Sequence, residues 1–117
     1  MSKIKVIKVG KIIDGNGNLI NNGLIVVKDK IIKKVGSSKE INLKQFKNYQ
    51  LIDLGKNVSA MPGMMDCHIH LCMYNNLTFK NYRVAQWEIT PELQQMYMLF
   101  HAQLCLDRGI TTLRDLG

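Results

Sequence analysis

Signals for a strand, a helix and a second strand follow one another in the C-terminal half, and this order constrains the fold most. Residues 64–71 form an apolar-rich run that predicts a strand. Thr90 and Pro91 predict a helix start, with Thr90 as the N-cap and Pro91 at the first helical position. Gly109 ends the helix, and the β-branched residues 110–113 predict a second strand. Such a unit implies two parallel strands joined by a right-handed crossover.

The N-terminal half has the pattern of a small antiparallel sheet. Short strands are expected at residues 3–9, 11–14, 24–27, 31–35, 51–54 and 58–61. Gly15-Asn16-Gly17-Asn18 and Asn22-Gly23 predict tight turns, and Gly10 predicts a bulge. The segment from Lys39 to Gln50 is polar and irregular, so we expect it to be a surface excursion.

Length and composition limit what the chain contains. It has 117 residues, of which 46% are hydrophobic and 21% are charged, values typical of a globular domain. This length is too short for a complete (β/α)8 barrel, which needs about 250 residues. A strand–helix–strand unit alone leaves both flanks of its sheet unpaired, so we expect the sheet of the C-terminal half to continue outside this sequence. No apolar run reaches the roughly 20 residues that span a bilayer, and three cysteines without an export signal favour the cytoplasm.

Positive charge is concentrated in the N-terminal half. Residues 1–56 carry twelve lysines and four acids, a net charge of +8, whereas residues 57–117 carry four basic residues and five acids, a net charge of −1. A basic half can indicate a nucleic-acid or membrane surface. However, it contains no arginine, and its lysines are spaced as on the solvated face of strands. We expect no membrane partner and rank a basic nucleic-acid-binding module last among the hypotheses.

The chemistry-bearing residues are Asp66, His68 and His70. Alternation along a strand places all three on one face. Two imidazoles with Cα atoms roughly 6.5–7 Å apart can converge on one metal ion. An open alternative is a pair of half-buried histidines bonded to backbone carbonyls. The acidic neighbour on the same face favours a bound cation.

A zinc-finger arrangement is a poorer interpretation of the same region. It would recruit Cys67 and Cys72, but the chain has no Cys-x-x-Cys sequence, and Cys67 faces away from the histidines on a regular strand. Cys105 follows His101 by four residues on the predicted helix. Packing at the edge of the core is the expected role of that pair.

Two motifs resemble a known family. Residues 61–71, Met-Pro-Gly-Met-Met-Asp-Cys-His-Ile-His-Leu, resemble the Pro-Gly-x-x-Asp-x-His-x-His signature of the metal-dependent amidohydrolase superfamily. Residues 109–117 resemble the second-strand motif of its imidazolonepropionase-like and prolidase-like branch. The sequences at 14–17, 28–36 and 52–55 are similar to the family's N-terminal strands. Residues 39–50 and 72–89 depart from the pattern.

The resemblance implies an α/β fold and a metal site. Residues 1–60 would form strands of a small β-sandwich, and residues 61–117 would begin a (β/α)8 TIM-type barrel. His68 and His70 would be ligands of one or two divalent ions, most simply zinc. Supporting roles would fall to Asp66, Arg114 and Asp115, with a plain ion pair of Arg114 with Asp115 or another acid as an open alternative. The other ligands of the family are a bridging carboxylated lysine or glutamate, two histidines and an aspartate, and like the proton-shuttling carboxylate they would lie outside this chain.

The implied activity is hydrolysis of C–N bonds by a metal-activated water. The substrate would be a small amide, cyclic amide or dipeptide-like molecule, and this chain alone would be an incomplete, inactive portion of the enzyme. A non-catalytic protein with the amidohydrolase fold is the second hypothesis, and a homo-oligomer is left open. The loop at residues 73–88 is a candidate substrate-facing element or a surface layer; its large residues are Tyr74, Phe79, Tyr82, Arg83 and Trp87.

Overall fold

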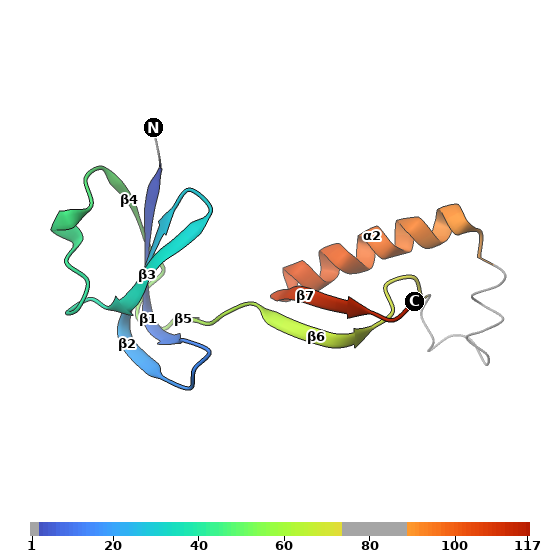
Figure 1. Cartoon of the computed structure of the whole chain (residues 1–117), viewed down its shortest axis with the longest axis horizontal. Helices are drawn as coiled ribbons and strands as arrows, with labels where there is room; N and C mark the ends of the chain where they lie inside the picture. The colour runs from blue at the N-terminus through green and yellow to red at the C-terminus, as the bar shows by residue number, and fades with distance from the viewer. Residues whose placement is uncertain (1–2, 74–88) are drawn as a thin grey trace. The chain divides into compact units, whose positions relative to one another are not determined.

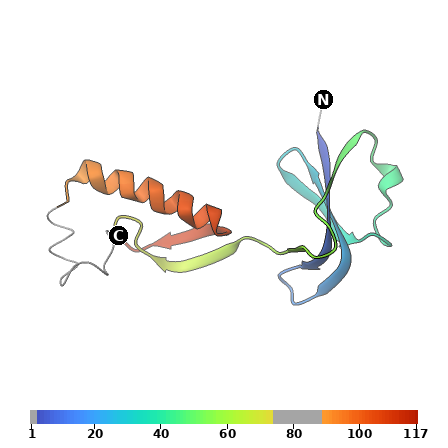
Figure 2. The same ribbon diagram turned by 180° about the vertical axis from the view of Figure 1, so that it is seen from behind.

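The computed structural model describes residues 3–73 and 89–117 and divides the chain into two compact units, residues 1–62 and 63–117 (Figures 1 and 2). The first unit contains β1 (Ile4–Ile13), β2 (Leu19–Lys28), β3 (Ile31–Ser37), the 3-10 turn η1 (Leu43–Gln45), β4 (Tyr49–Asp53) and β5 (Ser59–Ala60). The second contains β6 (Met64–Ile69), α2 (Pro91–Asp107) and β7 (Ile110–Asp115). The five large residues of the loop that is either substrate-facing or a surface layer, from Tyr74 to Trp87, lie outside the described residues.

The sheet of the first unit is built around β1. Its strand order is β3-β2-β1-β4, and β5 pairs with β1 beyond the end of β4. β1, β2 and β3 are antiparallel neighbours, as expected for the N-terminal half. β4 and β5 run parallel to β1, so the expectation of a wholly antiparallel sheet is wrong. The reason is the long connection between β3 and β4, which we call the return. It brings the chain back to the other end of the sheet, so that β4 starts beside the start of β1 and runs in the same direction.

That return also contributes to the core. Ile41 is only 6% exposed and packs with three buried residues of β1 and β2, namely Val6, Leu24 and Val26. Leu43 and Phe46 are partly buried against the same cluster. The expected surface excursion is therefore a cover for one face of the sheet. Its polar composition hides this role because a few apolar side chains are enough to close a small core.

Contacts with distant segments determine the structure at Gly10 and at Asn22-Gly23. β1 continues through Gly10, whose backbone N donates to the Val58 carbonyl at 2.9 Å. A Cβ at Gly10 would collide with the Lys56 carbonyl, so glycine is needed for this close backbone approach. The backbone N of Gly10 and that of Lys11 both donate to the Val58 carbonyl, an irregularity of the kind expected at Gly10. β2 likewise continues through Asn22-Gly23, because its pairing with β1 extends on both sides of that dipeptide.

The predicted turn between β1 and β2 is confirmed. Asp14 Oδ1 accepts hydrogen bonds from the backbone N of Asn16 at 2.8 Å and of Asn18 at 3.1 Å. The side-chain amide of Asn18 also donates to Asp14 Oδ2 at 2.8 Å. These bonds, the one from the Asn18 side chain foremost, hold the pKa of Asp14 below its ordinary value. The turn therefore stabilises an ionised carboxylate at the tip of the hairpin.

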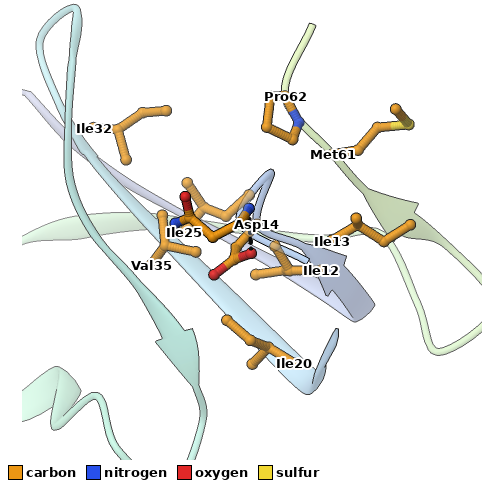
Figure 3. A pocket seen from close by; sticks show the side chains of 10 residues that line it. Ile12, Ile13, Asp14, Ile20, Ile25, Ile32, Val35, Met61 and Pro62 are labelled. Atoms are coloured by element: carbon orange, nitrogen blue, oxygen red, sulfur yellow. Dashed lines mark hydrogen bonds between the residues drawn. The ribbon is translucent and has the colours of Figure 1, made fainter. Parts of the chain in front are cut away.

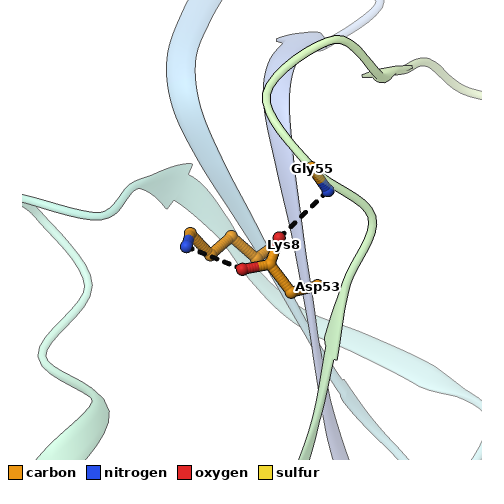
Figure 4. A network of polar contacts seen from close by, with 3 residues as sticks. All are labelled: Lys8, Asp53 and Gly55. Carbon is orange, nitrogen blue, oxygen red and sulfur yellow. Dashed lines mark hydrogen bonds and ion pairs between the residues drawn. The ribbon is translucent and has the colours of Figure 1, made fainter.

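A salt bridge ties β1 to β4. Lys8 Nζ lies 2.8 Å from Asp53 Oδ2, and the backbone N of Gly55 donates to Asp53 Oδ1 at 3.0 Å (Figure 4). The hydrogen bond from Lys8 is the main reason that the pKa of Asp53 is lowered from 3.8. Both side chains are nearly half exposed, so water and salt screen the pair.

The second unit confirms the predicted strand–helix–strand order. β6 and β7 form a two-stranded parallel sheet, and α2 packs on β7 (Figure 1). Thr90 is the N-cap of α2, and its Oγ1 accepts from the backbone N of Leu93 at 3.4 Å. Pro91 is the first helical residue, as predicted. The sequence signals for helix start and parallel pairing were therefore sufficient here.

Large apolar side chains lie on the surface of α2. Met96, Leu99 and Phe100 are 69%, 75% and 62% exposed. No residue of α2 is buried, because a two-stranded sheet covers little of the helix. No helix in the described segments has both the length and the apolar character needed to cross a bilayer.

Candidate metal centre

His68 lies near the end of β6, and His70 follows directly after that strand. Residues 66–69 of β6 occupy the same length as residues 113–115 of β7, so β6 contains a bulge. The bulge interrupts the regular pairing of β6 with β7 between Asp66 and Ile69. Asp66 Oδ1 accepts a hydrogen bond from the backbone N of His68 at 3.0 Å, which stabilises the bulge.

The two imidazoles nevertheless converge. His68 Nε2 lies 3.3 Å from His70 Nε2, with ring centroids 5.2 Å apart and an interplanar angle of 73°. His68 is exposed and His70 is half-buried. The same nitrogen of each ring therefore faces one point in space at the edge of the second unit.

A hydrogen bond to the backbone determines the tautomer of neutral His70. Its Nδ1 lies 2.6 Å from the carbonyl oxygen of Gly117. A carbonyl oxygen can only accept, so Nδ1 carries the proton and Nε2 keeps its lone pair. The carbonyl partner proposed in the alternative interpretation is thus present, but it occupies only the nitrogen remote from His68. Metal-binding histidines commonly have this arrangement.

The separation of the two nitrogens fits a shared ion. Two ligands at about 2.05 Å from a tetrahedral zinc ion lie about 3.3 Å apart, which matches the observed Nε2–Nε2 distance of 3.3 Å. In the described segments, no group of three or more His, Cys, Asp and Glu side chains could hold a metal ion. A catalytic zinc usually has three protein ligands and one open position. The donor set therefore fits a metal ion but is incomplete.

The predicted supporting residues on β7 differ in what they contact. Asp115 Oδ1 accepts from the backbone N of Gly117 at 3.1 Å, and the carbonyl of Gly117 accepts from His70. Asp115 is therefore linked to His70 through one residue. Arg114 is exposed and forms no ion pair with any described residue. Asp66 contacts the backbone of His68 and not its ring.

The start of β6 is held close to β7. The backbone N of Met64 donates to the Gly109 carbonyl at 2.9 Å. A Cβ at Gly63 would collide with the side chain of Thr111. The glycine of the Pro-Gly sequence therefore allows the two parallel strands to approach where the pair begins.

One contact was missed in the sequence. His101 Nδ1 on α2 lies 2.7 Å from the carbonyl oxygen of Leu71, just after His70. The sequence predicts packing of His101 and Cys105 at the edge of the core, and both residues are half-buried. The sequence did contain a signal for this contact. His101 follows Tyr97 by four residues, on a helix that has to pack beside the strand. The three cysteines form no disulfide.

A separate apolar hollow lies on the first unit (Figure 3). Its lining residues are Ile12, Ile13, Asp14, Asn16, Ile20, Ile25, Ile32, Val35, Met61 and Pro62. The acid among them, Asp14, is occupied by the bonds of its own turn. The hollow therefore carries no group poised for catalysis, and the chemistry is concentrated at the two histidines.

Comparison with known proteins identifies the family. Residues 59–117, half of the chain, match the family described as the amidohydrolase family. The chain belongs to the amidohydrolase family.

Individual relatives agree with this assignment. Ochratoxinase from Aspergillus niger is 36% identical over 69 residues, covering 59% of this chain and 14% of that protein. Imidazolonepropionase from Clostridium tetani is 40% identical over 57 residues, covering 47% of this chain and 13% of that protein. The chain thus spans about one seventh of the length of these relatives.

Solved structures extend the similarity to nearly the whole chain. The structure of A. niger ochratoxinase superimposes with a TM-score of 0.76 and 26% identity, over 99% of this chain and 26% of that one. A prolidase complexed with N-methylphosphonate-L-proline gives a TM-score of 0.74 and 27% identity, over 98% and 26%. The described segments are therefore a mixed α/β structure, mostly strands, similar to one part of the amidohydrolase fold.

Proposed function

We propose that this chain is the N-terminal portion of a metal-dependent hydrolase that cleaves C–N bonds. Family membership supports a hydrolase. The names of the similar proteins, imidazolonepropionase and prolidase among them, favour a small amide, cyclic amide or dipeptide-like substrate. The non-catalytic alternative would require loss of ligands that lie outside this chain.

The observation that carries the proposal is the 3.3 Å separation of His68 Nε2 and His70 Nε2. In the proposal these two nitrogens are metal ligands, and zinc is the expected ion because it favours imidazole in tetrahedral sites. A bound divalent ion would lower the pKa of a water ligand to about 7 and polarise the scissile carbonyl. His70 contributes a lone pair whose direction is held by the bond from Nδ1 to Gly117.

The neighbouring residues position these ligands. Asp66 holds the backbone of His68 through a 3.0 Å hydrogen bond, and Asp115 accepts from the backbone N of Gly117, the residue whose carbonyl contacts His70. We assign Arg114 a substrate-side role, because it lies exposed near the carboxyl end of β7. Barrel active sites form at the carboxyl ends of the strands, where both histidines and Arg114 lie.

The proposal includes the architecture of the whole protein. Residues 1–60 would be strands of a small β-sandwich, and residues 61–117 would begin a (β/α)8 barrel. In the described segments, β6 and β7 pair only with each other, so each of them has one unpaired edge. Further barrel strands could pair with these edges. The missing ligands and the proton-shuttling carboxylate would come from those strands, so this chain alone would be inactive. A cytoplasmic location is part of the proposal, supported by three cysteines that form no disulfide.

Zinc titration tests the site. Zinc is added to the chain in competition with a chromophoric chelator, and the affinity is compared for the wild type, His68→Ala and His70→Ala. Each substitution removes one of two donors, so we expect at least about a tenfold loss of affinity. Gln103→Ala, which removes a side-chain bond to Asp107 on α2, is the control and should bind like the wild type. Unchanged affinity in both histidine variants would refute the assignment.

A further inference from the structure

His101 connects α2 to the segment that follows His70. Its Nδ1 lies 2.7 Å from the carbonyl oxygen of Leu71, and the contact is partly buried. Because the carbonyl can only accept, His101 Nδ1 carries the proton in this contact. His101 on the helix therefore donates a hydrogen bond to the backbone of Leu71, just after the end of β6.

The Leu71 carbonyl belongs to a turn that begins at His70. The backbone N of Met73 donates to the His70 carbonyl at 3.3 Å, which closes residues 70–73 into a turn. Peptide orientations within a tight turn are mutually dependent. Holding the Leu71 carbonyl therefore restricts the backbone from which the His70 ring projects.

The His101 ring is itself held in place. Tyr97 stacks on it with centroids 6.0 Å apart and an interplanar angle of 17°. Phe100 packs edge-on at 5.6 Å and 62°. These two aromatic neighbours on the same helix limit the orientations of the imidazole, so the donor is preorganised toward Leu71.

We infer that His101 is a positioning residue for the candidate metal centre. It holds the turn at His70 so that His70 Nε2 stays 3.3 Å from His68 Nε2. Gly117 restrains the ring of His70, and His101 restrains its backbone. The consequence for metal binding rests on the proposed function, whereas the effect on the distance between the two rings does not depend on a metal.

Two measurements on the chain test the inference. The first is the nuclear Overhauser effect between the Hε1 protons of His68 and His70 without metal, and the second is zinc affinity by chelator competition. His101→Phe keeps an aromatic ring beside Tyr97 but removes the donor. We expect it to lose the ring–ring signal and to bind zinc about tenfold more weakly, the range seen for residues that orient metal ligands.

A matched amide pair separates the hydrogen bond from a general packing role. The Nδ2 of asparagine can take the place of imidazole Nδ1, whereas the Nε2 of glutamine corresponds to the other ring nitrogen. His101→Asn should therefore retain the signal and the affinity, and His101→Gln should lose both. Gln103→Ala removes a 2.9 Å bond to Asp107 on the same helix and should behave like the wild type.

The possible outcomes are distinct. A wild-type ring–ring signal and affinity in His101→Phe would overturn the inference, as would equal behaviour of the asparagine and glutamine variants. If His101→Phe fails to fold, the amide pair alone decides. If His68→Ala and His70→Ala bind zinc like the wild type, the proposed metal site fails, and the ring–ring signal still tests the positioning role of His101.

Discussion

His70 Nδ1 lies 2.6 Å from the carbonyl oxygen of Gly117, a residue 47 positions further along the chain. The backbone N of Gly117 donates to Asp115 Oδ1 at 3.1 Å, and the backbone N of Leu116 donates to the Ile69 carbonyl at 3.0 Å. The end of β7 therefore restrains the ring that projects from the end of β6.

The first prediction concerns Asp115. Asp115→Ala removes the acceptor for the backbone N of Gly117, so Gly117, whose carbonyl contacts His70, is held less firmly. We expect zinc affinity to fall up to about tenfold, measured by chelator competition. Asp115→Asn keeps an oxygen acceptor and should stay near the wild type. Equal affinities for Asp115→Ala and the wild type would show that Asp115 has no part in positioning His70.

The second prediction concerns the return between β3 and β4. Ile41→Ala should lower the free energy of unfolding by about 2–5 kcal/mol, because it removes a buried side chain from the small core. Ile32→Ala, at a residue that is 62% exposed, should change it by about 0.5 kcal/mol or less. Urea denaturation of the two variants makes the comparison. Similar losses would mean that the return does not cover the sheet.

The third prediction concerns acid. The pKa of Asp53 is lowered from 3.8 in the folded chain, chiefly by the Lys8 hydrogen bond. The ionised carboxylate therefore stabilises the fold at pH values above 3.8, and this contribution is lost as the pH falls through and below that value. Asp53→Asn should make Tm depend less on pH in that range. Lys8→Met should also reduce this dependence, because it removes the main cause of the lowered pKa. A steeper dependence in either variant would contradict the assignment.

The fourth prediction concerns metal removal. With only two imidazole donors, the chain should retain metal weakly and lose it to a chelator. Zinc at a concentration equal to its Kd should stabilise the fold by only about 0.4 kcal/mol. Thermal melts with and without zinc, together with metal analysis, test this expectation. Stoichiometric metal that survives the chelator, with a large rise in Tm, would mean that the donor set is already complete in this chain.

Local sequence patterns were sufficient where short-range physics decides structure. Thr90 and Pro91 predicted the start of α2 because capping satisfies the first amides of the helix within four residues. The turn after Asp14 followed from glycine and asparagine tolerating its backbone geometry. The His-x-His spacing on an extended segment identified two imidazoles that do converge.

The same patterns failed where a distant segment intervened. The Asn22-Gly23 dipeptide predicted a turn, but pairing with β1 carries the strand through it. The polar segment at residues 39–50 predicted a surface excursion, but Ile41 closes the core. The close approach of the Lys56 carbonyl to Gly10 was likewise not visible in the sequence.

What the amino-acid sequence determined by itself was the order of strands and helix in the second unit and the identity of the two candidate ligands. What only the tertiary structure decided was how those ligands are held. The bulge at Asp66, the bond from His70 to Gly117 and the bond from His101 to Leu71 bring together residues up to 47 positions apart. Local periodicity carries no information on such pairs, because they form only when packing brings α2 and β7 beside the end of β6.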